Sequence, residues 1–213
     1  MPEGPEVWIL SQAINLFNSK FNTCAYGKHL IIKDILEGDD IYFDWSFGLT
    51  GEVRINDANI LVKHNVGAIY GEQDMSRSKE ELLKGLGVSW IHASEEEFKK
   101  IIAKWSGLKR VLGALLLDQS QIAGIGVAWG SEILFRAGLK PDVKACEQDL
   151  SGLAAVMIAA RDEITALYLS ELTKTGDVKG FVNSWFKNLY KIRVMNVYKK
   201  GTQVKVSGRT WWV

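Results

Sequence analysis

The sequence has few cysteines and histidines, a nearly balanced charge and no long apolar run. Cys24 and Cys146 are far apart, and with His29, His64 and His92 they form no spacing typical of a zinc site. We therefore expect reduced thiols, no metal and no cofactor. No stretch reaches the roughly 18 apolar residues of a membrane span, and no basic-then-apolar leader is present. These absences predict a soluble intracellular protein of the cytoplasm, nucleoid or nucleus, with no membrane partner.

The net charge of +1 does not by itself indicate a nucleic-acid partner, but the distribution of charge is uneven. No Asp or Glu occurs from Val178 to Val213, and aromatic residues are interleaved with the cations of this segment. Such a segment is either a solvated basic face or a surface that binds a polyanion. Its cations are Lys179, Lys187, Lys191, Arg193, Lys199, Lys200, Lys205 and Arg209.

The residue pattern changes along the chain from sheet to helix and back to sheet. Apolar residues recur at helical spacing over residues 5–18, and short β-rich runs follow from Thr23 to Tyr70. After Trp90 the pattern predicts helices that run from a cap at Ser94 to Trp105, over 108–119, over 126–138 and from Ser151. The last 25 or so residues predict a strand, a tight turn and a returning strand.

The first residues, MPEGPEV, place a proline and two acids where they could share a pocket. Once Met1 is removed, Pro2 carries a secondary amine, and amines of this kind attack carbonyl carbons. An α-amine titrates near 8, so a larger share of it is nucleophilic at neutral pH than of a lysine. Glu3 adjoins the amine, and Glu6 lies one helical turn further on. The alternative is a plain helix start with acids near the positive end of the helix dipole.

A second motif is the pair Gly124-Ile125-Gly126 between two apolar helical stretches. Glycines at this place let backbone N–H groups approach an anion at the start of the following helix. A tight turn between two helices with no anion is the alternative.

Two stretches, PEGPEV and LLDQ-x-x-IAGIG-x-x-x-x-SEILFRAGLKP, resemble the formamidopyrimidine-DNA glycosylase / endonuclease VIII family. The family's fold class is α+β. The resemblance implies an N-terminal helix with an antiparallel β-sandwich, then a helix–two-turn–helix domain that ends in a β-hairpin. We accordingly predict a catalytic β-sandwich domain over 1–75, the helix–two-turn–helix domain over 92–178, and a basic C-terminal segment over 179–213. The hairpin has no cysteines, so it resembles the zincless fingers of some members, held by strand pairing and aromatic packing.

The resemblance assigns catalytic roles near the N-terminus. Pro2 would attack C1′ of the damaged nucleoside and form a Schiff base, and Glu3 would protonate the opened sugar or assist base loss. Glu6 would support proton transfer in the same pocket. Lys28, in GKH, matches a lysine that contacts the lesion phosphate, although a strand surface residue is the ordinary alternative.

Further residues match positions that hold DNA. Gly124 and Gly126 would contact the backbone, Arg209 would grip phosphates beside the flipped nucleotide, and Leu49 would fill the vacated base step. An apolar core residue is the alternative for Leu49. Glu132 matches a supporting acid near the active site, with a structural ion pair as its alternative.

The implied function is a bifunctional DNA glycosylase/AP lyase that excises oxidised bases, with pyrimidines favoured, and cleaves the strand by β- and δ-elimination. The expected partner of this monomer is damaged double-stranded DNA. Val127 stands where the family has a phosphate-binding asparagine, and no arginine-phenylalanine wedge is evident around residues 65–67. These departures predict loose recognition of the opposite base, which would admit single-stranded or bubble DNA. They also motivate one rival, a non-catalytic damage-binding module; a tautomerase with Pro2 as its base is a second.

Overall fold

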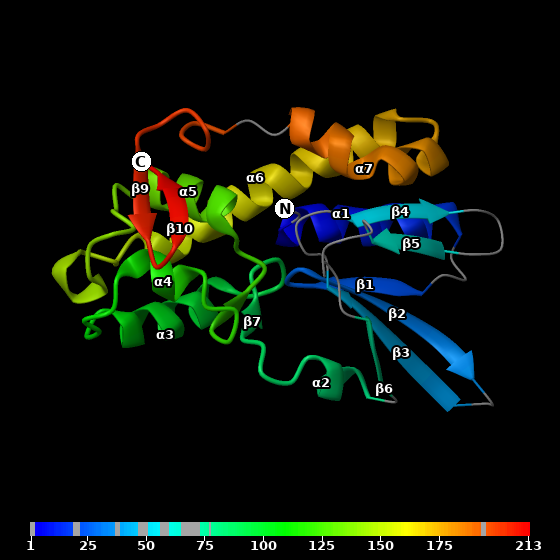
Figure 1. Cartoon of the computed structure of the whole chain (residues 1–213), viewed down its shortest axis with the longest axis horizontal. Helices are drawn as coiled ribbons and strands as arrows, with labels where there is room; N and C mark the ends of the chain where they lie inside the picture. The colour runs from blue at the N-terminus through cyan, green and yellow to red at the C-terminus, as the bar shows by residue number, and fades with distance from the viewer. Residues whose placement is uncertain are drawn as a thin grey trace. The chain divides into compact units, whose positions relative to one another are not determined.

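The computed structural model describes residues 3–18, 22–36, 39–46, 51–55, 60–64, 73–76, 78–192 and 195–213. The chain divides into two compact units, and Figure 1 shows the elements of both. Unit 1 combines Met1–Gly85 with Ile164–Arg193, and unit 2 combines Leu86–Glu163 with Val194–Val213.

Unit 1 begins with helix α1 (Gly4–Phe17), close to the predicted range 5–18. Pro5 lies in its first turn, where a missing backbone N–H breaks no helical hydrogen bond. The apolar face predicted from the spacing is buried, since Val7, Leu10 and Ile14 are inaccessible to solvent. The helix is therefore fixed to the interior of unit 1 from its first turn.

The strands of unit 1 pair antiparallel, as the sequence predicts. The larger sheet has the order β1-β2-β3-β6, and β4 pairs with β5 in register Gly51↔His64. The hairpin between β1 and β2 is closed by the two residues between Tyr26 and His29. The predicted sandwich stays a prediction. The strands are β1 (Thr23–Tyr26), β2 (His29–Leu36), β3 (Asp39–Ser46), β4 (Gly51–Ile55), β5 (Ile60–His64) and β6 (Gln73–Ser76), followed by the short helix α2 (Lys79–Leu82).

Two helices from late in the sequence complete unit 1. Helix α6 (Leu153–Lys174) passes from unit 2 into unit 1 at Ile164, and α7 (Val178–Ile192) packs against α1 and β4. Phe181, Val182 and Leu189 form the buried part of α7. The predicted domains 1–75, 92–178 and 179–213 stay predictions; within unit 1, this amphipathic helix packs with the N-terminal elements.

Unit 2 contains the helices that the sequence predicts after Trp90. Helix α3 (Glu95–Trp105) begins at the predicted cap: the Glu97 N–H donates to Ser94 Oγ at 3.3 Å, and the Ser94 N–H donates to Glu97 Oε2 at 2.8 Å. Helices α4 (Leu112–Leu116) and α5 (Val127–Arg136) flank the glycine turn. The remaining elements are the parallel pair β7 (Val88–Ser89) and β8 (Ile122–Ala123), and the 3-10 turn η1 (Ala145–Glu147).

Helix α4 is much shorter than the predicted stretch 108–119. The backbone before and at its start pairs with residues 141–146: the Leu112 N–H donates to Val143 O at 3.0 Å, and the Ala145 N–H donates to Arg110 O at 3.1 Å. These backbone hydrogen bonds take the place of the first turn of the predicted helix, so α4 begins only at Leu112. The helix then ends where Asp118 begins the turn toward α5.

The C-terminal hairpin consists of β9 (Gln203–Val206) and β10 (Arg209–Trp212), and it lies beside α5 (Figure 1). The strand–turn–strand prediction is confirmed over residues 203–212, whereas residues 195–202 form bends and turns. The buried side chains of unit 2 include four tryptophans: Trp90, Trp105, Trp129 and Trp211. In the part of the chain that the structure describes, no helix is long and apolar enough to cross a membrane.

Candidate functional site

The two acids of the PEGPE motif are brought together at the start of α1. Glu3 and Glu6 are each only 2% exposed. Glu3 is the N-cap residue, and its backbone N–H donates to Glu6 Oε2 at 2.9 Å. The spacing that suggested a shared pocket therefore corresponds to a direct bond between the Glu6 carboxyl group and the backbone of Glu3. Pro2 lies outside the described residues.

A tyrosine that the sequence analysis did not single out completes this acid site. The Tyr168 hydroxyl, from α6, donates to Glu6 Oε1 at 2.8 Å. Tyr168 is fully buried and belongs to unit 1, like both acids. The two residues are 162 positions apart in sequence, so no local pattern could have predicted the pair.

The other predicted site residues of unit 1 are Lys28 and Leu49. Lys28 is half-buried in the turn between β1 and β2, not within a strand. Leu49 lies outside the described residues. Their assigned roles stay predictions.

In unit 2, the side chain of Gln119 holds the glycine turn together. Its Nε2 donates to Leu117 O and to Ile125 O, both at 3.0 Å, and its Oε1 accepts the Gly124 N–H at 2.9 Å. Gly124 has φ +106°, a conformation that glycine adopts with little strain. The Gly124 N–H thus donates to a side chain within the turn. Gly124 therefore contributes to the turn through the shape of its backbone.

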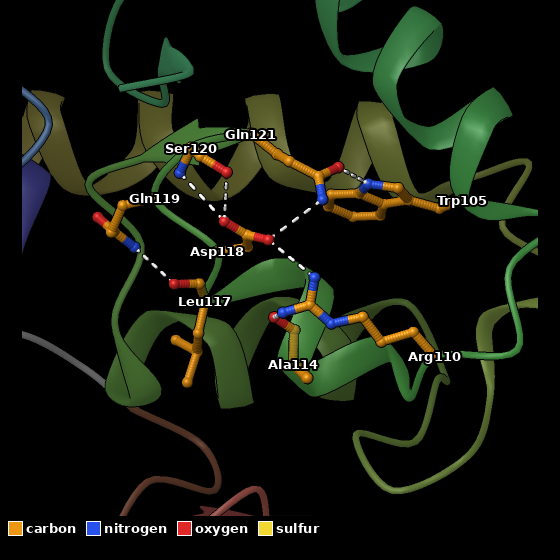
Figure 2. Close-up of polar contacts among 8 residues, drawn as sticks. All are labelled: Trp105, Arg110, Ala114, Leu117, Asp118, Gln119, Ser120 and Gln121. Atoms are coloured by element: carbon orange, nitrogen blue, oxygen red, sulfur yellow. Dashed lines mark hydrogen bonds and ion pairs between the residues drawn. The ribbon is translucent and has the colours of Figure 1, made fainter. Parts of the chain in front are cut away.

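A second polar cluster, centred on Asp118, holds residues 118–121 at the start of the turn (Figure 2). Asp118 accepts the Ser120 hydroxyl at 2.6 Å and Arg110 Nη1 at 2.8 Å, and Gln121 Nε2 donates to it at 3.3 Å. These hydrogen bonds, that of Ser120 foremost, lower the pKa of Asp118 to about 2. Gln121 in turn accepts the indole N–H of Trp105 from α3. The turn is therefore tied to α3 through Trp105 and to the segment before α4 through Arg110.

Gly126 is the N-cap of α5, and Val127 is the first residue of that helix. The first turn of a helix carries partial positive charge and presents backbone N–H groups, which favours an anion there. A valine side chain has no donor to add to them.

Glu132 anchors the segment that leads into the hairpin. It is fully buried, and its carboxyl group accepts the backbone N–H groups of Val197 at 2.7 Å and Tyr198 at 3.1 Å, and Asn196 Nδ2 at 3.1 Å. Its neighbour Ser131 accepts the Trp212 N–H at 3.1 Å through its hydroxyl. These contacts agree with a structural role for Glu132, which was the alternative to a role near the active site. Its partners here are two backbone N–H groups and the Asn196 amide, in place of the cation of an ion pair.

Trp211 fastens the hairpin to α4 and α5. A methyl group added at Gly113 or Gly130 would lie 2.9 Å from the Trp211 ring, so these two glycines give the indole its space. The ring is fully buried, and among the described residues its Nε1 has no hydrogen-bond partner. Aromatic packing was expected in this hairpin from its composition, but the two glycines that permit it were not predicted.

Cations and aromatic rings gather on the exposed part of the C-terminal segment. Arg209 is exposed at the first position of β10. The Tyr198 and Trp212 rings pack edge to face at 4.6 Å, and Lys199 Nζ lies 5.6 Å from the Tyr198 ring. Within the described residues, no group of three or more His, Cys, Asp or Glu is placed to hold a metal ion.

Comparison with solved structures identifies the fold. The chain is similar to the MutM (Fpg) protein of Thermus thermophilus, with a TM-score of 0.69, 22% identity, and 99% and 96% of the two chains covered. It is also similar to Lactococcus lactis formamidopyrimidine-DNA glycosylase non-covalently bound to DNA with an AP site, with a TM-score of 0.70, 18% identity, and 99% and 97% covered. The chain has the mixed helix and sheet fold of these DNA-repair glycosylases.

Sequence comparison points the same way over part of the chain. The chain is 28% identical over 109 residues to a formamidopyrimidine-DNA glycosylase of Shewanella sp. strain W3-18-1, which is 51% of this chain but only 39% of that protein. A Shewanella oneidensis relative of the same name matches over 102 residues. No protein-family model matches. Together the comparisons confirm the predicted resemblance to the formamidopyrimidine-DNA glycosylase / endonuclease VIII family; they do not test the zincless-finger type.

Proposed function

We propose that the protein is a DNA glycosylase that acts on damaged DNA and also cleaves the strand as an AP lyase. The observation that carries the proposal is the buried acid pair at the start of α1, where Glu6 binds the backbone N–H of the residue that follows Pro2. An amine nucleophile needs nearby groups that order its proton transfers, and this pair is placed next to it in the chain.

The reaction begins when the Pro2 amine attacks C1′ and the bond from C1′ to the base breaks. The base leaves with the bonding electrons and takes a proton, and the sugar ring oxygen takes a second proton as the ring opens to an iminium. Glu3 is the proposed source of one of these protons, because it adjoins the amine, and the proton that the amine loses as the iminium forms supplies the other. Loss of a proton from C2′ then expels the 3′ phosphate, and a further elimination expels the 5′ phosphate.

Unit 2 supplies the proposed DNA-binding surface. The first turn of α5 and the exposed Arg209 both favour phosphate oxygens, and neither reads base edges. A base inside a duplex is out of reach, so the nucleotide must be flipped into the site at a cost of a few kcal/mol. Lys28 and Leu49 are proposed to hold the lesion phosphate and the vacated base step.

The proposed substrates are oxidised bases, with pyrimidines favoured. Solved complexes of the Lactococcus lactis protein contain an oxidised pyrimidine in one case and an N7-benzyl-Fapy-dG lesion in another. These complexes support damaged DNA as the partner class.

Borohydride trapping on DNA with a ready-made abasic site tests the nucleophile. Wild-type protein whose intact mass shows removal of Met1 should form a covalent complex, and Pro2→Gly should not. Protein that retains Met1 is the matched control, since its Pro2 nitrogen is blocked within a peptide bond. Efficient trapping by Pro2→Gly would place the Schiff base either on the new terminal amine or on a lysine, and peptide mapping that finds the adduct on a lysine would refute the proposal.

Glu3→Gln tests the acid separately. It should abolish release of thymine glycol while retaining measurable cleavage at a ready-made abasic site, where no base has to leave. Equal loss of both activities would contradict the proposed role. The rival of a non-catalytic damage-binding module is not favoured, because the curated relatives described above are glycosylases. Binding without any strand cleavage would revive it.

A further inference from the structure

Tyr168 has no part in the reaction proposed above, yet it is bonded to the acid site. Its hydroxyl donates to one oxygen of Glu6 at 2.8 Å, and the other oxygen of Glu6 accepts the Glu3 N–H at 2.9 Å. All three residues are at least 98% buried. Two hydrogen bonds that share the Glu6 carboxyl group therefore connect α6 to the backbone N–H of Glu3, the N-cap residue of α1.

The geometry of these two hydrogen bonds bears on Pro2 through covalent structure. The nitrogen of Glu3 is bonded to the carbonyl carbon of Pro2, so a bond that fixes the Glu3 N–H fixes the plane of that peptide group. A carboxyl group at the end of a flexible side chain can rotate unless both oxygens are held. Tyr168 holds the oxygen of Glu6 that does not bind Glu3.

Burial makes the contact of Tyr168 consequential. Removal of the Tyr168 hydroxyl takes a donor from a carboxyl group that has little access to water as a replacement. The Glu6 side chain is then held less firmly at the oxygen that does not bind the Glu3 N–H.

We propose that Tyr168 is a positioning residue for the nucleophile: it fixes Glu6, and through the bond from Glu6 to the Glu3 N–H it restrains the peptide group that joins Pro2 to the chain. This inference rests on the proposed function, because it has a consequence only if Pro2 attacks C1′. It gives Glu6 a role in orienting the amine besides the transfer of protons.

The test is Tyr168→Phe, which removes only the hydroxyl group. A displacement of about 1 Å can slow a reaction on the order of 100-fold, so we expect single-turnover trapping at an abasic site to slow by about tenfold or more. The dissociation constant for uncleaved abasic-analogue DNA should stay within about twofold of wild type, since a misdirected amine affects the chemical step and not phosphate binding.

Thr23→Val is the matched control. The Thr23 hydroxyl is also buried and bonds the same helix, at Ser11 O (3.1 Å) and Asn15 Oδ1 (2.9 Å), further along α1 from the acids. The two variants should show similar losses in thermal midpoint, but only Tyr168→Phe should trap slowly. Equal slowing in both variants would reduce Tyr168 to a general stabiliser and overturn the inference. So would trapping by Tyr168→Phe that stays within about threefold of wild type.

A double-mutant cycle with Glu6→Ala tests the route of the effect. If Tyr168 acts through Glu6, its substitution should change the trapping rate by less than about twofold when Glu6 is already removed. Fully multiplicative effects would overturn the inference. Failure of wild-type protein to trap at all would instead refute the proposed function, so the two failures are distinguishable.

Discussion

The hydrogen bonds around Asp118 predict a specific loss of stability in Asp118→Asn. They lower the pKa of Asp118 from its ordinary value of 3.8 to about 2. Each pH unit between the two values corresponds to about 1.4 kcal/mol, which sets an upper limit of about 2.5 kcal/mol. Because the side chains of Asp118 and Arg110 are 22% and 49% exposed, solvent screening reduces the expected loss to about 1–2 kcal/mol at pH 7.

The loss should depend on pH with a defined sign. A carboxyl group with a lowered folded-state pKa stabilises the fold fully above its unfolded-state pKa, and the contribution disappears as pH falls through the folded-state value. The difference in unfolding free energy between wild type and Asp118→Asn should thus be constant above about pH 5 and shrink between about pH 4 and pH 2. Urea unfolding at a series of pH values measures it.

Asp142→Asn provides the control, since Asp142 is exposed in the same unit. It should change the unfolding free energy by less than about 0.5 kcal/mol at any pH. A difference for Asp118→Asn that does not vary with pH would refute the assignment of the stability to an ionised Asp118. An equal loss in Asp142→Asn would show that removal of a negative charge, and not the cluster, is responsible.

Two other substitutions test the remaining contacts of unit 2. Gln119→Ala removes the three side-chain hydrogen bonds to Leu117, Gly124 and Ile125. We expect DNA affinity at fixed salt to fall by about tenfold, with the thermal midpoint of unit 2 only slightly lowered. Unchanged affinity would show that the turn keeps its shape without the Gln119 side chain. Trp211→Ala should lower the unfolding free energy by about 3–5 kcal/mol. Trp211→Phe should lower it by less than about 2 kcal/mol, because it keeps an aromatic ring and removes the buried N–H that has no partner among the described residues. Equal losses in the two variants would contradict the packing role of the ring.

The parts of the fold that the sequence predicted are those that local chemistry controls. The start of α1 follows from Pro5 and its acids, the start of α3 from the Ser94–Glu97 box, and the hairpin from its turn residues. Helix α7 was missed because its basic and aromatic composition was read as a surface. Yet Val182 and Leu189, seven residues apart, already indicate a helical face.

The site was predicted in its residue types but not in its bonds. The spacing placed Glu3 and Glu6 within one helical turn, but it did not predict the bond between the Glu6 carboxyl group and the Glu3 backbone. The bonds of Tyr168 to Glu6 and of Glu132 to Val197 join residues 162 and 65 positions apart. Such pairs depend on tertiary packing, for which a single sequence carries no local signal. Pro2 and Leu49 lie outside the described residues, so their roles stay predictions.

The seating of Trp211 between Gly113 and Gly130 has a consequence for protein engineering. The indole packs the hairpin against the two helices that flank the glycine turn, so Arg209 and the start of α5 belong to one packed unit. A hairpin transplanted from a relative would keep this geometry only if the tryptophan and both glycines were transferred together. Replacement of either glycine by alanine would force the ring, and with it the cation, away from its present place.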